Sequence, residues 1–445
     1  MNKKSCVFIF RRDIRIKDNT TFLDIIKKFD IIYPVFFLVE EQVGSENNYK
    51  SADTVSFMKE IISQFQVPII KIKSYKDIPK TILKKYNDVS CVAFNKDYSP
   101  YSLKRDSYIT TELKKYGVSV ISEHDQLLMK DFFLRGKIPF SKFTFYYNKV
   151  KNTKIKPKEL TDELKREIYR KLDSPLLFEY PVRKNILSKF KNSKVIENYT
   201  KNRETLKEDT TRLSVYLKFG VVSPREAYTL FKDTEMLSRQ LFWRDFYYTY
   251  YFFNGIEPEF DIHWEKNKEL LEKWKKGETG YPIVDASMRQ LNQTGFMHNR
   301  GRMIVSSFLS KNLHIDWREG EKYFSKNLLD IDWIQNLAGW QSTVGVSKHS
   351  LPYFRVFNPF RQSKVHDPEC EYIKKWVPEL KDIPPVHIHN WEEYYSFYDN
   401  IYHKPCVDFE KTKKKFIEYV KNCKIVKKPN FVIKTKSGIM NIQLV

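Results

Sequence analysis

The chain has 445 residues, 78 of them lysine or arginine and 55 aspartate or glutamate, which gives a formal net charge of +23 at pH 7. This length predicts more than one domain, and the 41% hydrophobic residues are sufficient for a buried core. No run of about 18 uninterrupted apolar residues occurs, so we expect no membrane-spanning segment. The first apolar run is short and ends at charged residues, which predicts a strand and excludes a signal peptide.

The large positive charge favours a polyanionic partner, most commonly nucleic acid. The alternative is that lysine is simply favoured on solvated faces, as in proteins of AT-rich genomes, because many lysines are evenly scattered. The cysteines are far apart and match neither a disulfide framework nor a metal-ligand spacing. We therefore expect an intracellular protein, cytoplasmic or nuclear, that is not secreted and holds no metal. The cysteines are Cys6, Cys91, Cys370, Cys406 and Cys423.

Residues 1–120 alternate short apolar runs with segments of helical spacing. The apolar runs predict five strands, SCVFIF, IIYPVFFL, VPIIKIK, VSCVAFN and VSVIS. Strands that alternate with helices predict a parallel sheet covered on both faces, that is, a Rossmann-like α/β domain. No GxGxxG motif follows the first strand, so the usual dinucleotide fingerprint is absent.

The rest of the chain divides into three further parts. Residues 121–185 lack a regular period and are rich in lysine, proline and phenylalanine, so we expect a connector between domains. Helical patterns dominate from 186 to 422, which predicts an all-α domain. The tail, 423–445, alternates apolar and polar residues and is expected to add a strand or to stay loose.

The segment 280–342 places aromatic, acidic, amide and basic residues at fixed intervals in a helical pattern. Asn299, Arg302 and Met303 fall at i, i+3 and i+4, so one helix face offers an amide, a guanidinium and a thioether. Asn336 and Trp340 are one helical turn apart. Taken singly, each residue also fits a structural role, because tryptophan is usually buried and aspartate often caps a helix.

Five phrases of the chain resemble the photolyase/cryptochrome family, and in particular its class I cyclobutane pyrimidine dimer photolyases. They are TGYPIVDASMRQL, TGFMHNRGRM, IDWREGEKYF, LLDIDWIQNLAGWQ and PYFRVFNP. The resemblance runs from VFIFRRDIRIKDNTTF at the N-terminus to about residue 422. It implies light-driven repair of UV-damaged DNA by a monomer whose helical domain, 186–422, binds FAD and is catalytic.

The resemblance also implies that the N-terminal domain can hold an antenna chromophore. The phrase NKDYSP, residues 95–100, matches a family landmark. It does not distinguish folate, deazaflavin or a second flavin, and an empty antenna site is also possible.

The segment TTRLSVYLKFGVVSP places hydroxyl and backbone N–H groups before a helix, where they can cradle a phosphate. An ordinary helix start is the alternative, but by resemblance this segment holds the FAD diphosphate. Asp330 is then expected to pair with Arg302, and Asp332 to contact the flavin or ribityl region. Asn336 is expected to face flavin N5 and to favour the anionic reduced flavin. The residues assigned to FAD are Tyr199, Thr210, Thr211, Arg212, Leu213, Ser214, Gln240, Arg244, Asn299, Arg302, Asp330, Asp332 and Asn336.

Three tryptophans, Trp340, Trp317 and Trp264, fall on family positions that relay an electron from solvent to oxidised flavin. Composition alone would make them core residues, but their placement in the motifs favours the relay. We expect Trp274 and Trp376 to be structural. With Asn336 and Gln240, the three relay tryptophans make up the predicted catalytic set.

The resemblance places Gln240 and Trp243 at the lesion pocket and Arg244 near the flavin. Trp243 offers a flat apolar surface on which a damaged base can stack. Basic and polar residues at the rim would neutralise or bind phosphates beside a flipped-out lesion. The predicted DNA and lesion contacts are Arg203, Trp243, Asn299, Arg300, Met303, Ser342, Arg355 and Gln362.

Two residues depart from the dimer-photolyase pattern. Gln240 stands where these enzymes usually have glutamate; it carries no acidic proton, and glutamine is found there in (6-4) photolyases. Ser342 stands where a tryptophan commonly forms the second wall of the lesion pocket, so we expect weaker stacking unless Tyr353 or Phe354 compensates.

Two other functions therefore stay open. A (6-4) photolyase is favoured by Gln240 but opposed by Asn299 and Met303, because (6-4) repair needs a proton donor where its enzymes carry a histidine pair. A cryptochrome-like signalling flavoprotein is favoured by Ser342 and opposed by Asn336, the short tail and the positive charge. Repair of cyclobutane dimers is the function that we predict.

Overall fold

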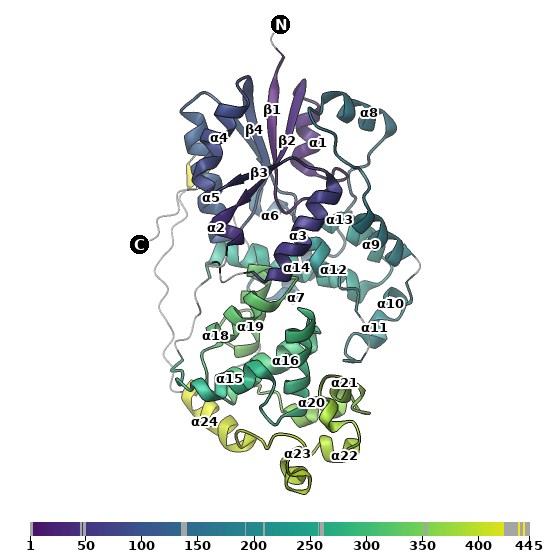
Figure 1. Ribbon diagram of the computed structural model, residues 1–445, viewed down its shortest axis with the longest axis vertical. Helices are drawn as coiled ribbons and strands as arrows, with labels where there is room; N and C mark the ends of the chain where they lie inside the picture. The colour runs from purple at the N-terminus through teal and green to yellow at the C-terminus, as the bar shows by residue number, and fades with distance from the viewer. Residues whose placement is uncertain are drawn as a thin grey trace.

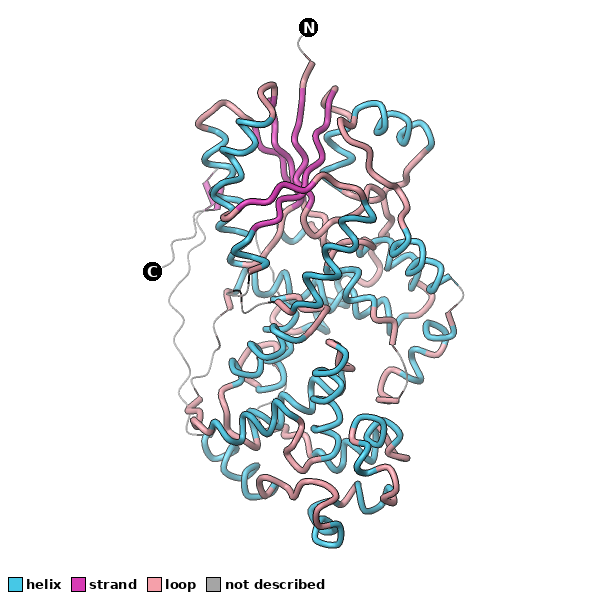
Figure 2. The backbone as a smooth tube through the Cα atoms, viewed as in Figure 1, coloured by secondary structure: helices cyan, strands magenta, loops and turns pink. Residues whose placement is uncertain are grey.

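The computed structural model describes residues 3–44, 47, 50–134, 140–191, 193–207, 210–256, 258, 262–350, 354–421, 435–436 and 439–440. An α/β part forms one end of the elongated molecule, and helices form the rest (Figures 1 and 2). The predicted fold class is therefore confirmed.

The sheet contains five parallel strands in the order β3-β2-β1-β4-β5. All six residues of β1 are buried, as expected for a central strand with helices on both faces. Alternate residues enter separate cores, with Phe8 and Phe10 on one face and Val7 and Ile9 on the other. The strands are β1 Ser5–Phe10, β2 Ile31–Val39, β3 Ile69–Ile72, β4 Val89–Asn95 and β5 Ser119–Glu123. The helices beside them are α1 Thr20–Ile26, α2 Glu40–Val43, α3 Ala52–Phe65, α4 Ile78–Lys85 and α5 Pro100–Lys114.

The connector contains helices, although no regular period was expected in this part of the chain. They are α6 Asp131–Leu134, α7 Phe143–Val150 and α8 Asp162–Lys171. Phe143, Tyr146, Tyr147 and Val150 are buried, at the i, i+3, i+4 and i+7 spacing of a helix, and α7 packs against α14. The helical signal was therefore present, but it spans only two turns in a lysine-rich segment.

After the connector, the described chain consists of helices joined by loops, apart from two short strands in the tail. Several end at glycines in the left-handed conformation, such as Gly295 with φ +63° after α16. These helices are α9 Pro181–Lys191, α10 Lys194–Glu197, α11 Tyr199–Asn202, α12 Leu213–Lys218, α13 Pro224–Phe231, α14 Glu235–Asn254, α15 Lys268–Lys276, α16 Pro282–Thr294, α17 Asn299–Lys311, α18 Trp317–Asn327, α19 Trp333–Val344, α20 Pro359–His366, α21 Glu371–Trp376, α22 Pro385–Ile388, α23 Trp391–Tyr394 and α24 Phe409–Lys421.

The predicted tail lies outside the described residues apart from two short strands, β6 Thr435–Lys436 and β7 Ile439–Met440, which pair antiparallel. None of the described helices is long and apolar enough to cross a membrane. Within the described part of the chain, no cluster of three histidine, cysteine or acidic side chains could hold a metal ion.

Candidate active site

Three helices, α14, α17 and α19, frame the region that the sequence predicts to be the site, because α19 packs against both of the others. Gly339 of α19 is exposed, and a Cβ built on it would meet no atom within 4 Å. Asn336 lies one turn earlier and Ser342 one turn later on the same helix face. This face of α19 therefore borders open space.

The amide of Asn336 is held in one orientation. Its nitrogen donates to the backbone oxygen of Glu321 at 3.1 Å, to Glu321 Oε1 at 2.9 Å and to Ser325 Oγ at 3.1 Å. Burial raises the pKa of Glu321. Because the amide nitrogen is committed to these partners, the carbonyl oxygen of Asn336 remains the group available for a ligand.

Asp330 joins two of the predicted FAD-binding segments. Its Oδ2 accepts from Ser214 Oγ at 2.6 Å and from Arg302 Nη2 at 3.0 Å. The expected pair of Arg302 and Asp330 is thus present, and it lies beside the start of α12. Three predicted site residues from distant parts of the sequence meet here.

Asp332 points toward the carboxyl end of β1. Its Oδ2 accepts from Arg12 Nη2 at 2.5 Å and from the hydroxyl of Tyr248, while Oδ1 caps α19 by accepting from Gln335 N. Burial alone would raise the pKa of Asp332, but Arg12 and Arg244 lower it to about 2. Arg12 was not among the predicted site residues, and its only signal in the sequence is its position just after the first predicted strand.

The residue before α12 has an unusual backbone conformation. Arg212 adopts the left-handed conformation with φ +49°, and its guanidinium lies 4.8 Å from the ring centre of Phe296. Few non-glycine residues adopt this conformation, and those that do are often found at functional sites. Thr211 and Leu213 are buried beside it, and Thr210 is half-buried.

The remaining predicted FAD residues lie on separate helices. Tyr199 begins α11 and is partly exposed. On α14, Gln240 Nε2 donates to the backbone oxygen of Met236 at 3.0 Å. Arg244 donates through Nη1 to the backbone oxygen of Gln126, and its buried Nη2 has no hydrogen-bond partner in the described part of the chain. A buried unpartnered guanidinium N–H is a donor in need of an acceptor.

The predicted lesion platform, Trp243, has one ring face covered. Phe143 of α7 stacks on it with centroids 3.7 Å apart and planes inclined by 9°. On α17, the amide of Asn299 lies 3.8 Å from the sulfur of Met303. Ser342 of α19 lies beside Tyr247, which is one turn beyond Trp243 on α14. Tyr353 lies outside the described residues, and Phe354 is exposed.

The predicted DNA rim is organised around Glu204. This carboxylate accepts from Arg203 Nε at 3.1 Å and from the guanidinium of Arg300. The backbone oxygen of Glu204 is hydrogen-bonded to His366 of α20, the helix that carries Gln362. Arg355 is exposed, and its backbone oxygen accepts from Lys311.

The predicted relay tryptophans are buried to different extents. Trp340 and Trp317 are buried, whereas Trp264 is partly exposed. Among the described residues the three make no ring contact with one another. The ring of Trp340 instead lies 6.2 Å from Trp274 and 5.1 Å from Phe324. Trp274, which we expected to be structural, is therefore an oxidisable ring beside Trp340.

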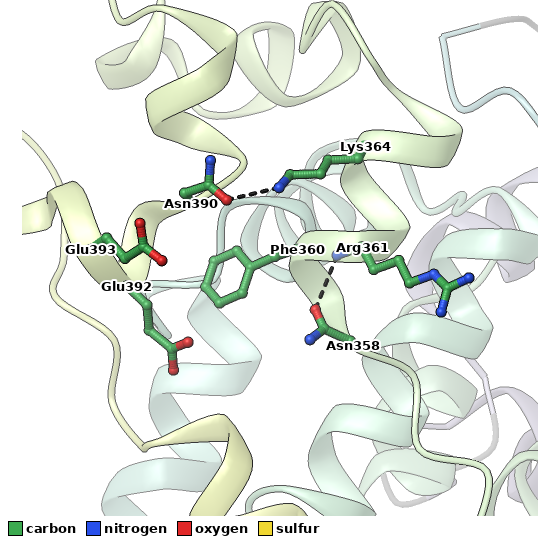
Figure 3. A pocket seen from close by; sticks show the side chains of 7 residues that line it. All are labelled: Asn358, Phe360, Arg361, Lys364, Asn390, Glu392 and Glu393. Carbon is green, nitrogen blue, oxygen red and sulfur yellow. Dashed lines mark hydrogen bonds between the residues drawn. The ribbon is translucent and has the colours of Figure 1, made fainter.

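A separate cavity of about 320 Å³ lies between α20 and the α22–α23 region (Figure 3). Lys364 Nζ donates to Asn390 Oδ1 across the cavity at 2.8 Å. The carboxylates of Glu392 and Glu393 lie on the side opposite Lys364 (Figure 3). None of the predicted site residues lines this cavity. Its lining consists of Asn358, Phe360, Arg361, Lys364, Asn390, Glu392 and Glu393.

Comparison with known proteins identifies the family. A model of the DNA photolyase family matches residues 6–163, and one described as the FAD binding domain of DNA photolyase matches residues 236–422. The deoxyribodipyrimidine photo-lyase of Buchnera aphidicola subsp. Baizongia pistaciae is 33% identical over 76% of this chain and 80% of its own length. The chain belongs to the photolyase/cryptochrome family. Its predicted class, an FAD-dependent photo-lyase, is confirmed.

Two further family members cover nearly the whole chain. The deoxyribodipyrimidine photo-lyase of Alkalihalophilus pseudofirmus is 30% identical over 93% of this chain and 97% of its own. The crystal structure of the photolyase from Sulfolobus tokodaii with two FAD molecules matches with a TM-score of 0.81. It is 33% identical and covers 94% of this chain and 100% of that one.

The side chains at the photolyase site fit FAD. Gly339 leaves open space on α19, the carbonyl oxygen of Asn336 is available as an acceptor, and Arg244 offers an unpartnered buried donor. Ser214, Arg302 and Asp330 form a polar group beside them. We propose that these residues hold the cofactor and that its phosphates lie near Arg212 at the start of α12.

Substituting Gly339 with alanine tests the cofactor position. In the apoprotein we expect stability to rise by about 0.5–1 kcal/mol, because alanine favours a helix over glycine and the new methyl group meets no atom. We expect FAD retention to fall, because the methyl group occupies the open face. The measurements are the thermal unfolding midpoint of the apoprotein and the flavin bound after dialysis. Unchanged FAD retention would place the cofactor elsewhere.

Proposed function

We propose that this photolyase-family enzyme splits cyclobutane pyrimidine dimers in UV-damaged DNA under blue or near-ultraviolet light. Its relatives from Buchnera and Alkalihalophilus are named deoxyribodipyrimidine photo-lyases. When bound and reduced, FAD supplies light-driven transfer of one electron to the dimer, and the electron returns to the flavin after the cyclobutane ring opens. Net redox change is zero, so the polypeptide itself must mainly bind, orient and shield the lesion.

The side chains divide this work between them. Trp243, backed by Phe143 at 3.7 Å, presents its other face to a flipped-out base. Gln240 and Asn299 offer amide groups to the edges of the pyrimidines. Arg203 and Arg300, which are held together by Glu204, neutralise phosphates beside the lesion. A dimer is already poorly stacked in DNA, which lowers the cost of flipping it.

One observation carries the choice of cyclobutane dimers. Asn299 and Met303 contact each other at the predicted lesion face, and neither can donate an acidic proton. His298 at the start of α17 and His349 beside Tyr247 do not supply the missing acidic proton. Burial lowers the pKa of His298 to about 4 and that of His349 to about 3, so both are neutral near pH 7. Chemistry without proton donation, as in dimer splitting, suits this site.

Gln240 favours a second candidate, repair of (6-4) photoproducts, because it offers a neutral amide where dimer photolyases usually carry a carboxylic acid. Its amide nitrogen donates to the backbone oxygen of Met236, and this neutral side chain provides no acidic proton. This weakens the second candidate without changing the class of enzyme.

The deciding experiment uses FAD-loaded, reduced enzyme and two oligonucleotides, one with a single cyclobutane thymine dimer and one with a single (6-4) product. We expect light-dependent loss of the first lesion alone, with no loss in the dark. Repair of only the (6-4) product would overturn the assignment. Loss of neither lesion, with flavin bound and photoreducible, would favour a signalling role.

A further inference from the structure

The structure places a second aromatic ring beside Trp243 at the site proposed for the lesion. Tyr247 lies one helical turn further along α14, with its ring centre 5.3 Å from that of Trp243 and its plane inclined by 38°. Both rings are partly exposed. Since Phe143 covers one face of Trp243, the exposed parts of the two rings form one continuous, bent aromatic surface.

Ser342 of α19 lies beside Tyr247 at this surface. Burial raises the pKa of Tyr247 by more than the neighbouring Ser342 hydroxyl lowers it, so the phenol keeps its proton. Ser342 lies one turn beyond Gly339, whose Cβ position opens into empty space. Tyr247 therefore lies beside the part of α19 that borders this open space. A large side chain at position 342 would compete with Tyr247 for this place.

Tyr247 is also supported from behind. The ring of His349 lies 5.3 Å from it at 61°, and His349 is in turn hydrogen-bonded to the hydroxyl of Tyr251 at 2.8 Å. Lys142, next to Phe143, donates to the backbone oxygen of Ser350 and ties α7 to the same loop. A ring held on several sides loses little conformational entropy when a ligand stacks on it.

We propose that Tyr247 is a lesion-binding residue that takes the place of an aromatic wall at position 342, so that Trp243 and Tyr247 each receive one pyrimidine of the dimer. A cyclobutane ring joins its two bases at an angle, and two inclined rings fit such a pair better than one plane does. The hydroxyl groups of Tyr247 and Ser342 can also bond a pyrimidine carbonyl. The inference rests on the proposed function.

The test is binding in the dark of FAD-loaded enzyme to two fluorescent single-stranded oligothymidylates, one with a cyclobutane dimer and one undamaged. For Tyr247→Ala we expect about tenfold to a hundredfold weaker binding of the dimer strand, the scale of one lost base–aromatic stack. Binding of the undamaged strand should not change. Tyr247→Phe, which keeps the ring, should bind the dimer strand within about threefold of wild type.

The control is Tyr116→Ala, because Tyr116 is 68% exposed on the α/β part. It should bind both strands as wild type does, and flavin absorbance should match in all variants. If Tyr247→Ala retains the wild-type preference for the dimer strand, the role of Tyr247 is overturned while the proposed function stands. If the wild type itself shows no preference, the proposed function fails, and this inference fails with it.

Discussion

Replacing Asp125 with alanine is expected to lower the stability of the protein by about 3–5 kcal/mol, the cost of breaking a buried ion pair from one side. Asp125 is fully buried after β5. Its Oδ2 accepts from Arg15 at 2.5 Å, and its Oδ1 accepts from Arg225 of α13 and from the backbone of Thr20, both at 2.9 Å. The substitution would leave the buried guanidinium of Arg15 without its carboxylate. The loss of stability is measured by unfolding in guanidinium chloride, followed by tryptophan fluorescence.

The effect of Asp125 should depend on pH in a known direction. Burial alone would raise the pKa of Asp125, but Arg15 and Arg225 lower it below the ordinary value of 3.8. The stabilisation is therefore fully present above about pH 4. It is lost as the pH falls further, so wild type and variant should converge in acid.

A matched control is Asp162→Ala, which removes an exposed carboxylate paired with Lys165. Its unfolding midpoint should equal that of wild type, because exposed ion pairs contribute little. Equal midpoints for Asp125→Ala and wild type would show that the buried cluster does not hold the α/β part to the helices.

The sequence predicted the sheet correctly for a physical reason. Parallel strands covered by helices are buried on both faces, so they appear as nearly continuous apolar runs such as SCVFIF. The connector helices gave a weaker signal. α7 buries Phe143, Tyr146, Tyr147 and Val150 at helical spacing, but eight residues in a lysine-rich stretch are too few to stand out.

The motifs marked many candidate residues but not their partners. The pair of Arg302 and Asp330 was expected from the family pattern, and the structure shows it. Arg12 and Asp332, by contrast, are 320 positions apart, and no spacing rule connects them. Only the fold brings the end of β1 to the start of α19, so the α/β part contributes a charge beside the proposed FAD site.

The lesion wall illustrates the same limit. The resemblance to dimer photolyases predicts a tryptophan where this chain has Ser342, and it offered only the nearby Tyr353 and Phe354 as compensation. Tyr247 lies 95 positions earlier and reaches Ser342 because α14 packs against α19. Local pattern therefore identifies which position has changed, whereas packing decides which side chain fills the space.

Gly320→Ala is expected to destabilise the protein and to displace Trp340. Gly320 lies in α18, and a Cβ on it would be 2.1 Å from the ring of Trp340 and 2.6 Å from Leu309. Trp340 is buried between Trp274 and Phe324, so its ring has little room to move. Overpacking of this kind costs about 1–3 kcal/mol, which exceeds the gain of roughly 0.5–1 kcal/mol from removing a helical glycine.

The comparison with Gly339→Ala gives this prediction a sharp test, because both changes add one methyl group to a helical glycine. Gly320→Ala should lower the unfolding midpoint of the apoprotein, whereas Gly339→Ala should raise it. Because Trp340 is predicted to pass electrons to oxidised flavin, Gly320→Ala should also slow photoreduction of the FAD-loaded enzyme. Repair by chemically reduced enzyme should be affected less, because it bypasses that step. Wild-type stability and photoreduction in Gly320→Ala would contradict the tight packing of α18 on Trp340.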